Sequence, residues 1–238
     1  MPSTGNPDMI QILRALVPSV SWSAVPVAAL LLAACQTNPP TKGKVEGGIY
    51  SSPDGNYTMP IPLGGEFGRR IMDDARDLQG KEGFVSILND FGEVRSVEYT
   101  ELPAAERERF AGGELPGLLE WFYRDGVVGL KSQKFPGMRS LHDEALESED
   151  GPAHFGIAFV PGGSALVGAN VLGLPSNEHK DSLRAFLVFA RDGFAYNLGC
   201  TYSEDALKPD LALTPARIER YKGSLVAMRA SMRFPPPH

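Results

Sequence analysis

The strongest constraint on the fold is the stretch between residues 183 and 202, in which apolar side chains alternate with others in two successive runs. One run spans residues 183–189 and the next spans residues 194–202. Between them, Arg191-Asp192-Gly193 supplies turn residues, including a glycine that accepts a positive φ. Because successive side chains of a strand point to opposite faces, each run has one apolar face. The stretch therefore predicts a central β-hairpin within a mainly antiparallel sheet.

Several other runs predict further strands. Residues 84–88 and 93–99 flank a turn-rich connection and form a second hairpin. Two short extended pieces flank the turn Pro53-Asp54-Gly55. The remaining assignments are a strand over 127–135, an acidic loop over 142–151, and a buried strand over 155–160 with a partner over 165–171. Residues 63–82 are left open, because their helical spacing is interrupted by glycines.

Apolar side chains recur at helical spacing in two segments. One helix begins near Leu115, carries Pro116 in its first turn and is expected to end at Asp125-Gly126. The other is the last element of the chain, with Thr214 as its cap and Pro215 at its first position. A short charged helix is predicted over 103–110. The apolar stripes of the two longer helices are Leu115, Leu118, Leu119 and Phe122, and Ile218, Tyr221, Leu225, Met228 and Met232.

This order of elements predicts an α+β fold. Most of the strands are antiparallel neighbours, and the regular strand–helix alternation of a parallel sheet is missing from the pattern. The C-terminal helix is expected to pack on the sheet through its apolar stripe. The prediction is therefore a mostly antiparallel sheet flanked by helices.

The N-terminal segment has the features of a signal peptide. An uncharged apolar run over 24–34 precedes Cys35, and the polar segment 36–46 follows it. The run is too short to span a bilayer but fits the apolar part of a signal peptide. The alternative, a buried helix over 10–35, is disfavoured because Pro18 and Pro26 interrupt it, and a proline in a helix interior costs about 3 kcal/mol.

The four residues Leu32-Ala33-Ala34-Cys35 resemble the lipobox of bacterial lipoproteins. The resemblance implies cleavage before Cys35, a diacylglyceryl group on its sulfur, and a further acyl chain such as palmitate on the new amino terminus. Two or more acyl chains anchor a protein stably in a membrane. Gln36 at the second mature position resembles the pattern of lipoproteins sorted to the outer membrane of Gram-negative bacteria, where they face the periplasm.

These features divide the chain into three parts. They are a signal peptide over 1–34, the lipidated Cys35 with a flexible tether over 35–46, and a single α+β domain over 47–238. The residues before the apolar run carry little positive charge, and a start at Met9 in place of Met1 gives a more typical signal peptide. The sequence leaves both starts open.

The predicted elements resemble the Mog1/PsbP-like fold, an antiparallel sheet flanked by helices. The matching segments are residues 50–57 running to Ile61-Pro62, the hairpin around Arg191-Asp192-Gly193, and the closing helix that ends at Ser231-Met232-Arg233-Phe234. Proteins of this fold include extrinsic photosystem subunits, a small-GTPase-binding protein and bacterial envelope lipoproteins, and most of them are non-catalytic. The resemblance therefore implies an accessory or binding protein, although a fold alone does not decide function.

No motif for catalysis, for a metal or for a cofactor emerges from the sequence. Gly162-Gly163-Ser164 lacks the second glycine of a nucleophile elbow, and residues 64–70 lack the lysine of a P-loop. The acidic cluster of residues 142–150 matches no calcium loop and is expected to be solvated. His154 and His179 stand isolated, as surface or strand-end residues.

Charge and cysteine content narrow the function further. The 23 basic and 29 acidic residues give a net charge of −6. No basic stripe is present that could displace counterions from a nucleic acid, so nucleic-acid binding is not expected. Cys200 lies on the apolar face of its strand and is expected to be an inert core residue that has no disulfide partner in Cys35.

Three consecutive aromatic residues are the only hint of a binding surface. Because a helix cannot bury Trp121, Phe122 and Tyr123 on one face, Phe122 is assigned to the core stripe. Trp121 and Tyr123 are then candidates for a binding rim or groove.

The leading hypothesis is a lipid-anchored, non-catalytic accessory or binding protein of the bacterial envelope, held at the membrane and contacting an envelope protein. Two alternatives remain: an envelope hydrolase with a site assembled from distant residues, and a small-ligand binder with a cavity between helix and sheet. A polar pocket containing a histidine and a carboxylate would favour the hydrolase. An apolar pocket would favour the ligand binder, and a flat aromatic patch near Trp121 would favour the protein-binding module.

Overall fold

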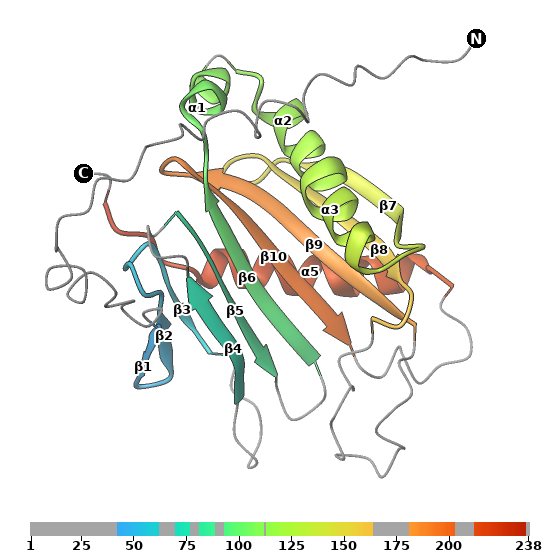
Figure 1. Ribbon diagram of the computed structural model, residues 1–238, viewed down its shortest axis with the longest axis horizontal. Helices are drawn as coiled ribbons and strands as arrows, with labels where there is room; N and C mark the ends of the chain where they lie inside the picture. The colour runs from blue at the N-terminus through green and yellow to red at the C-terminus, as the bar shows by residue number, and fades with distance from the viewer. Residues whose placement is uncertain are drawn as a thin grey trace, which may run out of the picture. The chain divides into compact units, whose positions relative to one another are not determined.

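An antiparallel sheet forms the centre of the computed structural model, which describes residues 42–61, 70–76, 81–88, 93–111, 113–163, 181–202 and 212–236 (Figure 1). Within these ranges the sheet has seven strands in the order β4-β5-β6-β10-β9-β8-β7. All six neighbouring pairs are antiparallel. The strands are β4 (Arg70–Arg76), β5 (Glu82–Leu88), β6 (Glu93–Glu101), β7 (Arg139–Leu146), β8 (Ala153–Val160), β9 (Ser182–Arg191) and β10 (Phe194–Tyr202).

The predicted central hairpin is confirmed as β9 and β10. Arg191 pairs with Phe194, so Asp192 and Gly193 form a two-residue connection. Both connecting residues have positive φ, 51° and 82°, as a type I′ turn requires. The second predicted hairpin is also confirmed, because β5 pairs with β6. The β10 strand joins the two hairpins through its pairing with β6, which places it in the middle of the sheet.

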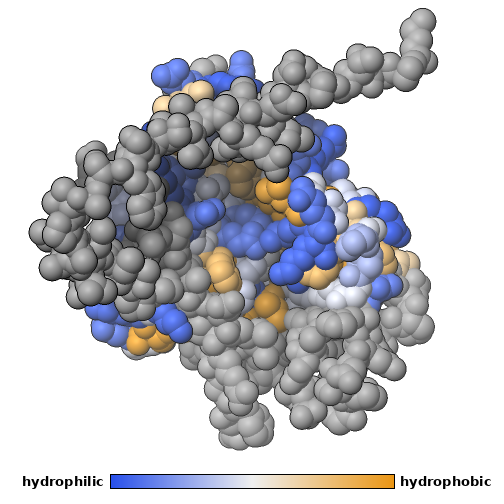
Figure 2. Space-filling model, viewed as in Figure 1, coloured by the Kyte–Doolittle hydropathy of each residue, from blue (hydrophilic) through white to orange (hydrophobic). Residues whose placement is uncertain are grey.

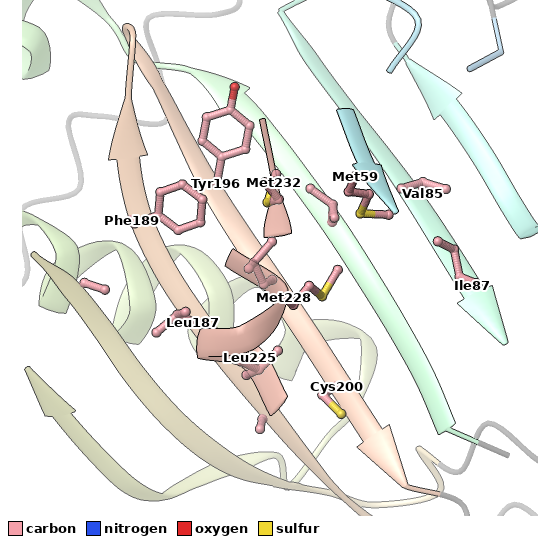
Figure 3. Packing of buried hydrophobic residues seen from close by; sticks show 14 of the residues in the cluster. Met59, Val85, Ile87, Leu187, Phe189, Tyr196, Cys200, Leu225, Met228 and Met232 are labelled. Atoms are coloured by element: carbon pink, nitrogen blue, oxygen red, sulfur yellow. The ribbon is translucent and has the colours of Figure 1, made fainter. Parts of the chain in front are cut away.

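One face of the sheet is covered by the C-terminal helix α5 (Pro215–Ser231). Thr214 caps this helix as predicted, because its Oγ1 accepts a hydrogen bond from the Arg217 backbone N–H at 3.3 Å. The predicted stripe of α5 faces the sheet, where Leu225 and Met228 pack with Leu187, Phe189 and Tyr196 (Figure 3). Cys200 lies in the same cluster, as expected of a core cysteine.

A small three-stranded sheet completes this core. It consists of β1 (Lys44–Glu46), β2 (Ile49–Ser51) and β3 (Thr58–Pro60) in that order. Tyr50 and Met59 are buried in the same cluster as α5. The tether predicted over 35–46 is therefore too long at its end, because Lys44–Glu46 pair with β2. The side chains of β1 are exposed, so this strand depends on backbone pairing and leaves no apolar pattern in the sequence.

The opposite face carries a continuous helical segment, preceded by the predicted short helix α1 (Ala104–Ala111). The segment runs through α2 (Leu115–Trp121), the π-helix η2 (Phe122–Gly129) and α3 (Leu130–Lys134). The predicted end at Asp125-Gly126 and the predicted strand over 127–135 are therefore wrong. Tyr123 and Val127 are buried against the sheet. Their burial outweighs the cost of Gly126 in a helix, which is about 1 kcal/mol.

The acidic loop predicted over 142–151 is also wrong for most of its length, because β7 spans Arg139–Leu146. Charged side chains on both faces of this strand form ion pairs. The strand therefore lacks the alternation of apolar residues by which a sequence pattern predicts a strand. The undecided stretch contains the edge strand β4. The partner strand predicted over 165–171 lies outside the described residues.

The fold class is that predicted from the sequence: a mostly antiparallel α+β arrangement with the C-terminal helix packed on the sheet. None of the helices in the described ranges has the length and apolar character needed to cross a bilayer.

Candidate functional site

A groove lies between the η2–α3 segment and the part of the sheet that this segment leaves uncovered. The α2 and η2 helices contact β8 and β9, whereas the same face of β5, β6 and β10 borders a pocket of about 620 Å³. Figure 2 shows the hollow on this face, with hydrophobic and hydrophilic side chains gathered around it. Two other pockets in the described part of the chain measure only about 170 and 210 Å³. A volume of about 620 Å³ falls within the range of small-molecule sites.

Most of the groove lining is apolar, and it comes from both the helix and the sheet. Phe122, Val127 and Leu130 contribute from the helical side, and Phe84 and Ala195 contribute from the strands. Leu130 is 62% exposed and lies at the rim of the groove. Small residues line the groove on both sides: Gly83 and Ala195 on strands, and Gly126 on η2.

The polar part of the groove is centred on Glu98 of β6. Its Oε1 accepts a hydrogen bond from Lys131 Nζ at 2.6 Å, and its Oε2 accepts one from Asn197 Nδ2 at 2.9 Å. Asn197 is only 4% exposed, and its other amide atom, Oδ1, has no hydrogen-bond partner. This oxygen has almost no accessible surface, so it is a buried, unpaired acceptor, which costs about 1–3 kcal/mol of stability.

Arg184 of β9 lies on the same face of the sheet. Its Nε donates a hydrogen bond to Thr201 Oγ1 at 3.3 Å. Burial lowers the pKa of its guanidinium, and the negative charge of Glu98 acts in the opposite direction. The Glu98 carboxylate therefore has two cations near it, Lys131 in direct contact and Arg184 through space.

The structure separates the two residues predicted to form a binding rim. Trp121 is 53% exposed on α2, as an aromatic rim residue would be. Tyr123 is fully buried, so its predicted place at a rim is wrong. Its hydroxyl shares a hydrogen bond with Ser140 Oγ at 3.0 Å, and burial raises its pKa to about 12. Phe122, which had been assigned to the core, lines the groove in its place.

The exchange of roles between Phe122 and Tyr123 follows from the helix geometry. The predicted apolar stripe ran from Leu115 to Phe122, on a helix that was expected to end at Asp125-Gly126. In the structure the residues buried on the helix are Leu118, Leu119, Tyr123 and Val127. The helix continues as a π-helix, which shifts the buried face relative to an ideal α-helix. The sequence contains one sign of this buried face: Val127 follows Tyr123 at the same four-residue spacing at which Tyr123 follows Leu119.

Cys200 is confirmed as a core residue. It is 1% exposed, and burial raises the pKa of its thiol to about 12. The neighbouring carboxylate of Glu93, whose Oε1 lies 3.4 Å from Sγ, acts in the same direction. A thiol with a raised pKa is a poor nucleophile. The lipidation candidate Cys35 and His179 lie outside the described residues.

His154 is not isolated, in contrast to the prediction. It is 4% exposed and its Nε2 lies 3.2 Å from Asp143 Oδ2, while its ring packs 5.2 Å from the ring of Tyr123. Asp143 is also bound by Arg124 Nη2 at 2.9 Å. Neither His154 nor Asp143 lines the groove. Within the described residues, no three metal-ligating side chains of the His, Cys, Asp or Glu type are grouped to hold a metal ion.

Comparison with known proteins gives no match to a family model and none to a curated protein. Among solved structures, the chain is similar to the solution structure of the cyanobacterial PsbP protein CyanoP from Synechocystis, with a TM-score of 0.46 and 14% sequence identity. That match covers 86% of this chain and 99% of CyanoP. The chain is also similar to the Ran-binding protein Mog1p of Saccharomyces cerevisiae, with a TM-score of 0.43, 11% identity, and coverage of 82% and 96%.

Proposed function

We propose that this protein is a lipid-anchored binding module of the bacterial envelope, and that the groove between η2–α3 and β5-β6-β10 is its binding site. The observation that carries the proposal is the groove itself. It combines a volume of about 620 Å³ and an apolar lining with the polar cluster of Glu98, Lys131 and Asn197. An apolar pocket with a few converging polar groups is the usual form of a small-molecule site.

The anchor is supported by the sequence around Cys35. The apolar run 24–34 and the lipobox-like Leu32-Ala33-Ala34-Cys35 are the features that favour acylation of Cys35, which precedes the first residue of β1 by nine positions. A tether of residues 36–43 would hold the described domain close to the membrane surface. Gln36 favours the outer membrane, with the domain on its periplasmic side.

The groove favours the ligand-binding alternative over the hydrolase. The hydrolase hypothesis needs a histidine and a carboxylate in a polar pocket, but His154 and Asp143 do not line the groove. The hydroxyl of Ser140 is hydrogen-bonded to Tyr123, and no hydrogen bond within the described residues joins it to His154. Ser140 therefore lacks the adjacent base that a nucleophilic serine requires. Trp121 is 53% exposed on α2, where a protein partner could also make contact.

The binding site is tested by crosslinking in intact cells. A photo-crosslinking residue replaces Leu130 at the rim of the groove, and in a matched chain it replaces Val226, which is 41% exposed on α5 on the other face of the sheet. Illumination should give an adduct, seen in the intact mass of the chain, from position 130 and not from position 226. Thr100→Trp should abolish the adduct, because Thr100 lines the groove and the indole would fill it. Equal adducts at both positions would argue against the groove.

The anchor is tested separately. In Cys35→Ser the lipid-accepting sulfur is removed, so we expect loss of acylation and release of the chain from the membrane fraction. Cys200→Ser is the matched control, because it removes the chain's other cysteine. Retention of the Cys35→Ser chain in washed membranes would contradict the anchor without bearing on the groove.

A further inference from the structure

A second pocket, separate from the groove, lies at the C-terminal end of α5. It has a volume of about 210 Å³ and is lined by residues from the end of β9, from the last turn of α5 and from the segment that follows α5. Phe189 and Met232 are two of its lining residues (Figure 3). Phe189 belongs to the cluster that packs under α5, so this pocket lies on the face of the sheet opposite to the groove.

Three of the described residues that line this pocket are arginines, and they reach it from different places. Arg191 is the last residue of β9, Arg229 belongs to the last turn of α5, and Arg233 follows the helix. Asp150 contributes a carboxylate to the same lining. Because like charges at short range repel, an anion held among guanidinium groups stabilises their charged forms. We call this site the arginine pocket.

Arg229 forms the inner wall of the arginine pocket and is held in place. It is 7% exposed, and its guanidinium carbon lies 4.5 Å from the centre of the Phe189 ring. Its Nη1 donates to Ser148 Oγ at 3.3 Å and to the Gly151 carbonyl oxygen at 3.1 Å. Its Nη2 donates to the carbonyl oxygen of Asp150. These acceptors are neutral, so they satisfy N–H groups of Arg229 without cancelling its charge.

The electrostatics around Arg229 agree with a place for an anion. Burial lowers the pKa of Arg229. The carboxylate of Asp150 opposes this effect, whereas the positive charge of Arg191 adds to it. An anion in the pocket would act in the same direction as Asp150 and favour the charged guanidinium.

Arg191 and Arg233 are the arginines of the pocket that a ligand can reach. The Arg191 side chain is 46% exposed, and Arg233 is exposed as well. The guanidinium carbon of Arg191 lies 4.5 Å from the centre of the Phe234 ring, and its Nε lies 3.5 Å from Asp192 Oδ2. An ion pair this exposed contributes little, so a ligand can compete for Arg191. Arg233 Nη1 donates to the Ala230 carbonyl oxygen at 2.9 Å, which holds the side chain at the end of α5.

The arrangement favours phosphate over carboxylate. The oxygen atoms of a phosphate group are arranged tetrahedrally, so guanidinium groups can donate to it from different directions. A carboxylate has two oxygens in one plane and is best matched by a single guanidinium fork. The volume of about 210 Å³ holds a phosphate group with a small substituent, and it lies below the range of drug-sized ligands.

We propose that the arginine pocket binds a phosphate group. Arg191 and Arg233 donate hydrogen bonds to the phosphate oxygens, and Arg229 contributes positive charge from the inner wall. Two sources offer this group: a soluble phosphate monoester, and the phosphodiester of a phospholipid head group. The site goes beyond the proposed function, because it uses a different pocket and does not depend on the groove.

The test uses four soluble probes: inorganic phosphate, glycerol 3-phosphate, glycerophosphoglycerol and acetate. Glycerol 3-phosphate is a monoester, glycerophosphoglycerol is the diester head group of phosphatidylglycerol without its acyl chains, and acetate is the carboxylate control. Each is titrated at constant ionic strength into the isotope-labelled 238-residue chain, and binding is followed through the backbone NMR shifts of Ala230 and Arg233, which line the pocket. We expect inorganic phosphate to bind about tenfold more tightly than acetate.

The two esters distinguish the sources of the phosphate. Tighter binding of glycerol 3-phosphate than of glycerophosphoglycerol assigns the pocket to a soluble monoester. Equal or tighter binding of glycerophosphoglycerol assigns it to a phospholipid head group.

A double variant connects binding to the proposed residues. Arg191→Gln with Arg233→Gln removes both accessible charges and keeps an N–H donor at each position, so the affinity for inorganic phosphate should fall about tenfold or more. Arg229 stays unchanged, because its hydrogen bonds hold residues 148–151. Cooperative thermal unfolding shows that the variant is folded. If it is not folded, Arg191→Gln alone provides the same test with a smaller expected decrease.

The matched control removes the same charge elsewhere on the surface. Arg107→Gln with Arg139→Gln changes two arginines outside the described lining of the pocket. Arg139, like Arg191, has its guanidinium carbon over a phenylalanine ring, 4.4 Å from the centre of Phe159. This control should bind inorganic phosphate as tightly as the unchanged chain.

The outcomes decide the site and the ligand class separately from the groove. Acetate binding as tight as that of phosphate would overturn the phosphate class. Equal affinity of the unchanged chain and the Arg191 and Arg233 variant, or an equal loss in the control, would overturn the assignment to this pocket. Absence of binding by all three phosphate probes at millimolar concentration would overturn the proposal, whereas the groove is decided by the crosslinking at position 130.

Discussion

Gly156 shows how tightly single positions of this fold are packed. It lies on β8, and a Cβ added to it would collide with the ring of Tyr123. That ring has no freedom to move away, because it is fully buried and its hydroxyl is bonded to Ser140. The absence of a side chain at Gly156 is therefore what allows the η2 helix to approach the sheet. A sequence shows the glycine but not the ring that requires it.

This argument predicts the effect of one methyl group at two glycines. Gly156→Ala should lower the free energy of unfolding by about 1–3 kcal/mol, the usual cost of overpacking a core. Gly117→Ala should instead raise it by about 0.5–1 kcal/mol, because Gly117 lies exposed on α2 with open space around it. Urea unfolding of the full chain measures both. An unchanged free energy of unfolding in Gly156→Ala would show that the Tyr123 ring does not pack against β8.

The candidate site could be predicted only in part at this scale. The sequence singled out the run Trp121, Phe122 and Tyr123, but the one that lines the groove is Phe122, which was assigned to the core. Asn197 and Glu98 were missed, because an amide and a carboxylate in two alternating strands are indistinguishable from ordinary solvent-facing residues. Only the pairing of β6 with β10, which sets Glu98 opposite Asn197, brings them together.

Among the elements, those with one clear apolar face were predictable. The β9–β10 hairpin and α5 carry uninterrupted stripes, and both are found within or close to their predicted bounds. The β7 strand failed because Asp143 and Glu144 are stabilised by ion pairs instead of by apolar contacts. The η2 helix was not predicted because Asp125-Gly126 is locally a strong turn signal. What keeps this segment helical is the burial of Val127 against the sheet, which is a tertiary effect.

The packing of α5 gives a prediction at the scale of one helix. Leu225 is fully buried in the core against the sheet, and its neighbour Val226 is 41% exposed. Leu225→Ala should destabilise the fold by about 2–5 kcal/mol through the cavity it leaves. Val226→Ala should change stability by about 0.5 kcal/mol or less. Thermal and urea unfolding test the pair, and similar effects of the two changes would mean that α5 is rotated relative to the sheet.

At the scale of the whole molecule, the sheet has two differently covered faces. The α5 face buries one continuous cluster that includes residues of the small β1–β3 sheet. The opposite face buries a smaller cluster under α2 and η2, and it leaves β5, β6 and β10 to form the groove. This asymmetry gives a rigid scaffold on one side and a ligand-accessible surface on the other. The unequal cover depends on where the α2–η2–α3 segment ends, which no local sequence pattern encodes.

The edge strand β7 links both layers to the sheet. Asp143 accepts hydrogen bonds from Arg124 Nη2 of η2 at 2.9 Å and is paired with His154. The next residue, Glu144, points to the other face, where its Oε1 accepts a hydrogen bond from Lys222 Nζ of α5 at 2.9 Å. Burial acts to raise the pKa of the Asp143 carboxyl, but the bonds from Arg124 and His154 lower it overall. The bond from Lys222 lowers the pKa of Glu144 against a smaller effect of burial.

Both pKa values lie below those of the unfolded chain, which fixes the sign of the pH dependence. Each carboxylate contributes stability above its unfolded pKa, near 3.8 for Asp143 and 4.5 for Glu144, and that stability is lost as the pH falls through the folded pKa. The free energy of unfolding should therefore decrease as the pH falls below about 4.5. In the Asp143→Asn, Glu144→Gln double variant, stability at pH 7 should be lower and the decrease on acidification smaller. The control is Glu147→Gln, whose side chain is exposed just beyond β7 and which should keep the full acid dependence. Urea unfolding between pH 7 and pH 3 measures the unchanged chain and both variants. If the double variant loses as much stability on acidification as the unchanged chain, the ion pairs of β7 do not stabilise the packing of the two helical layers on the sheet.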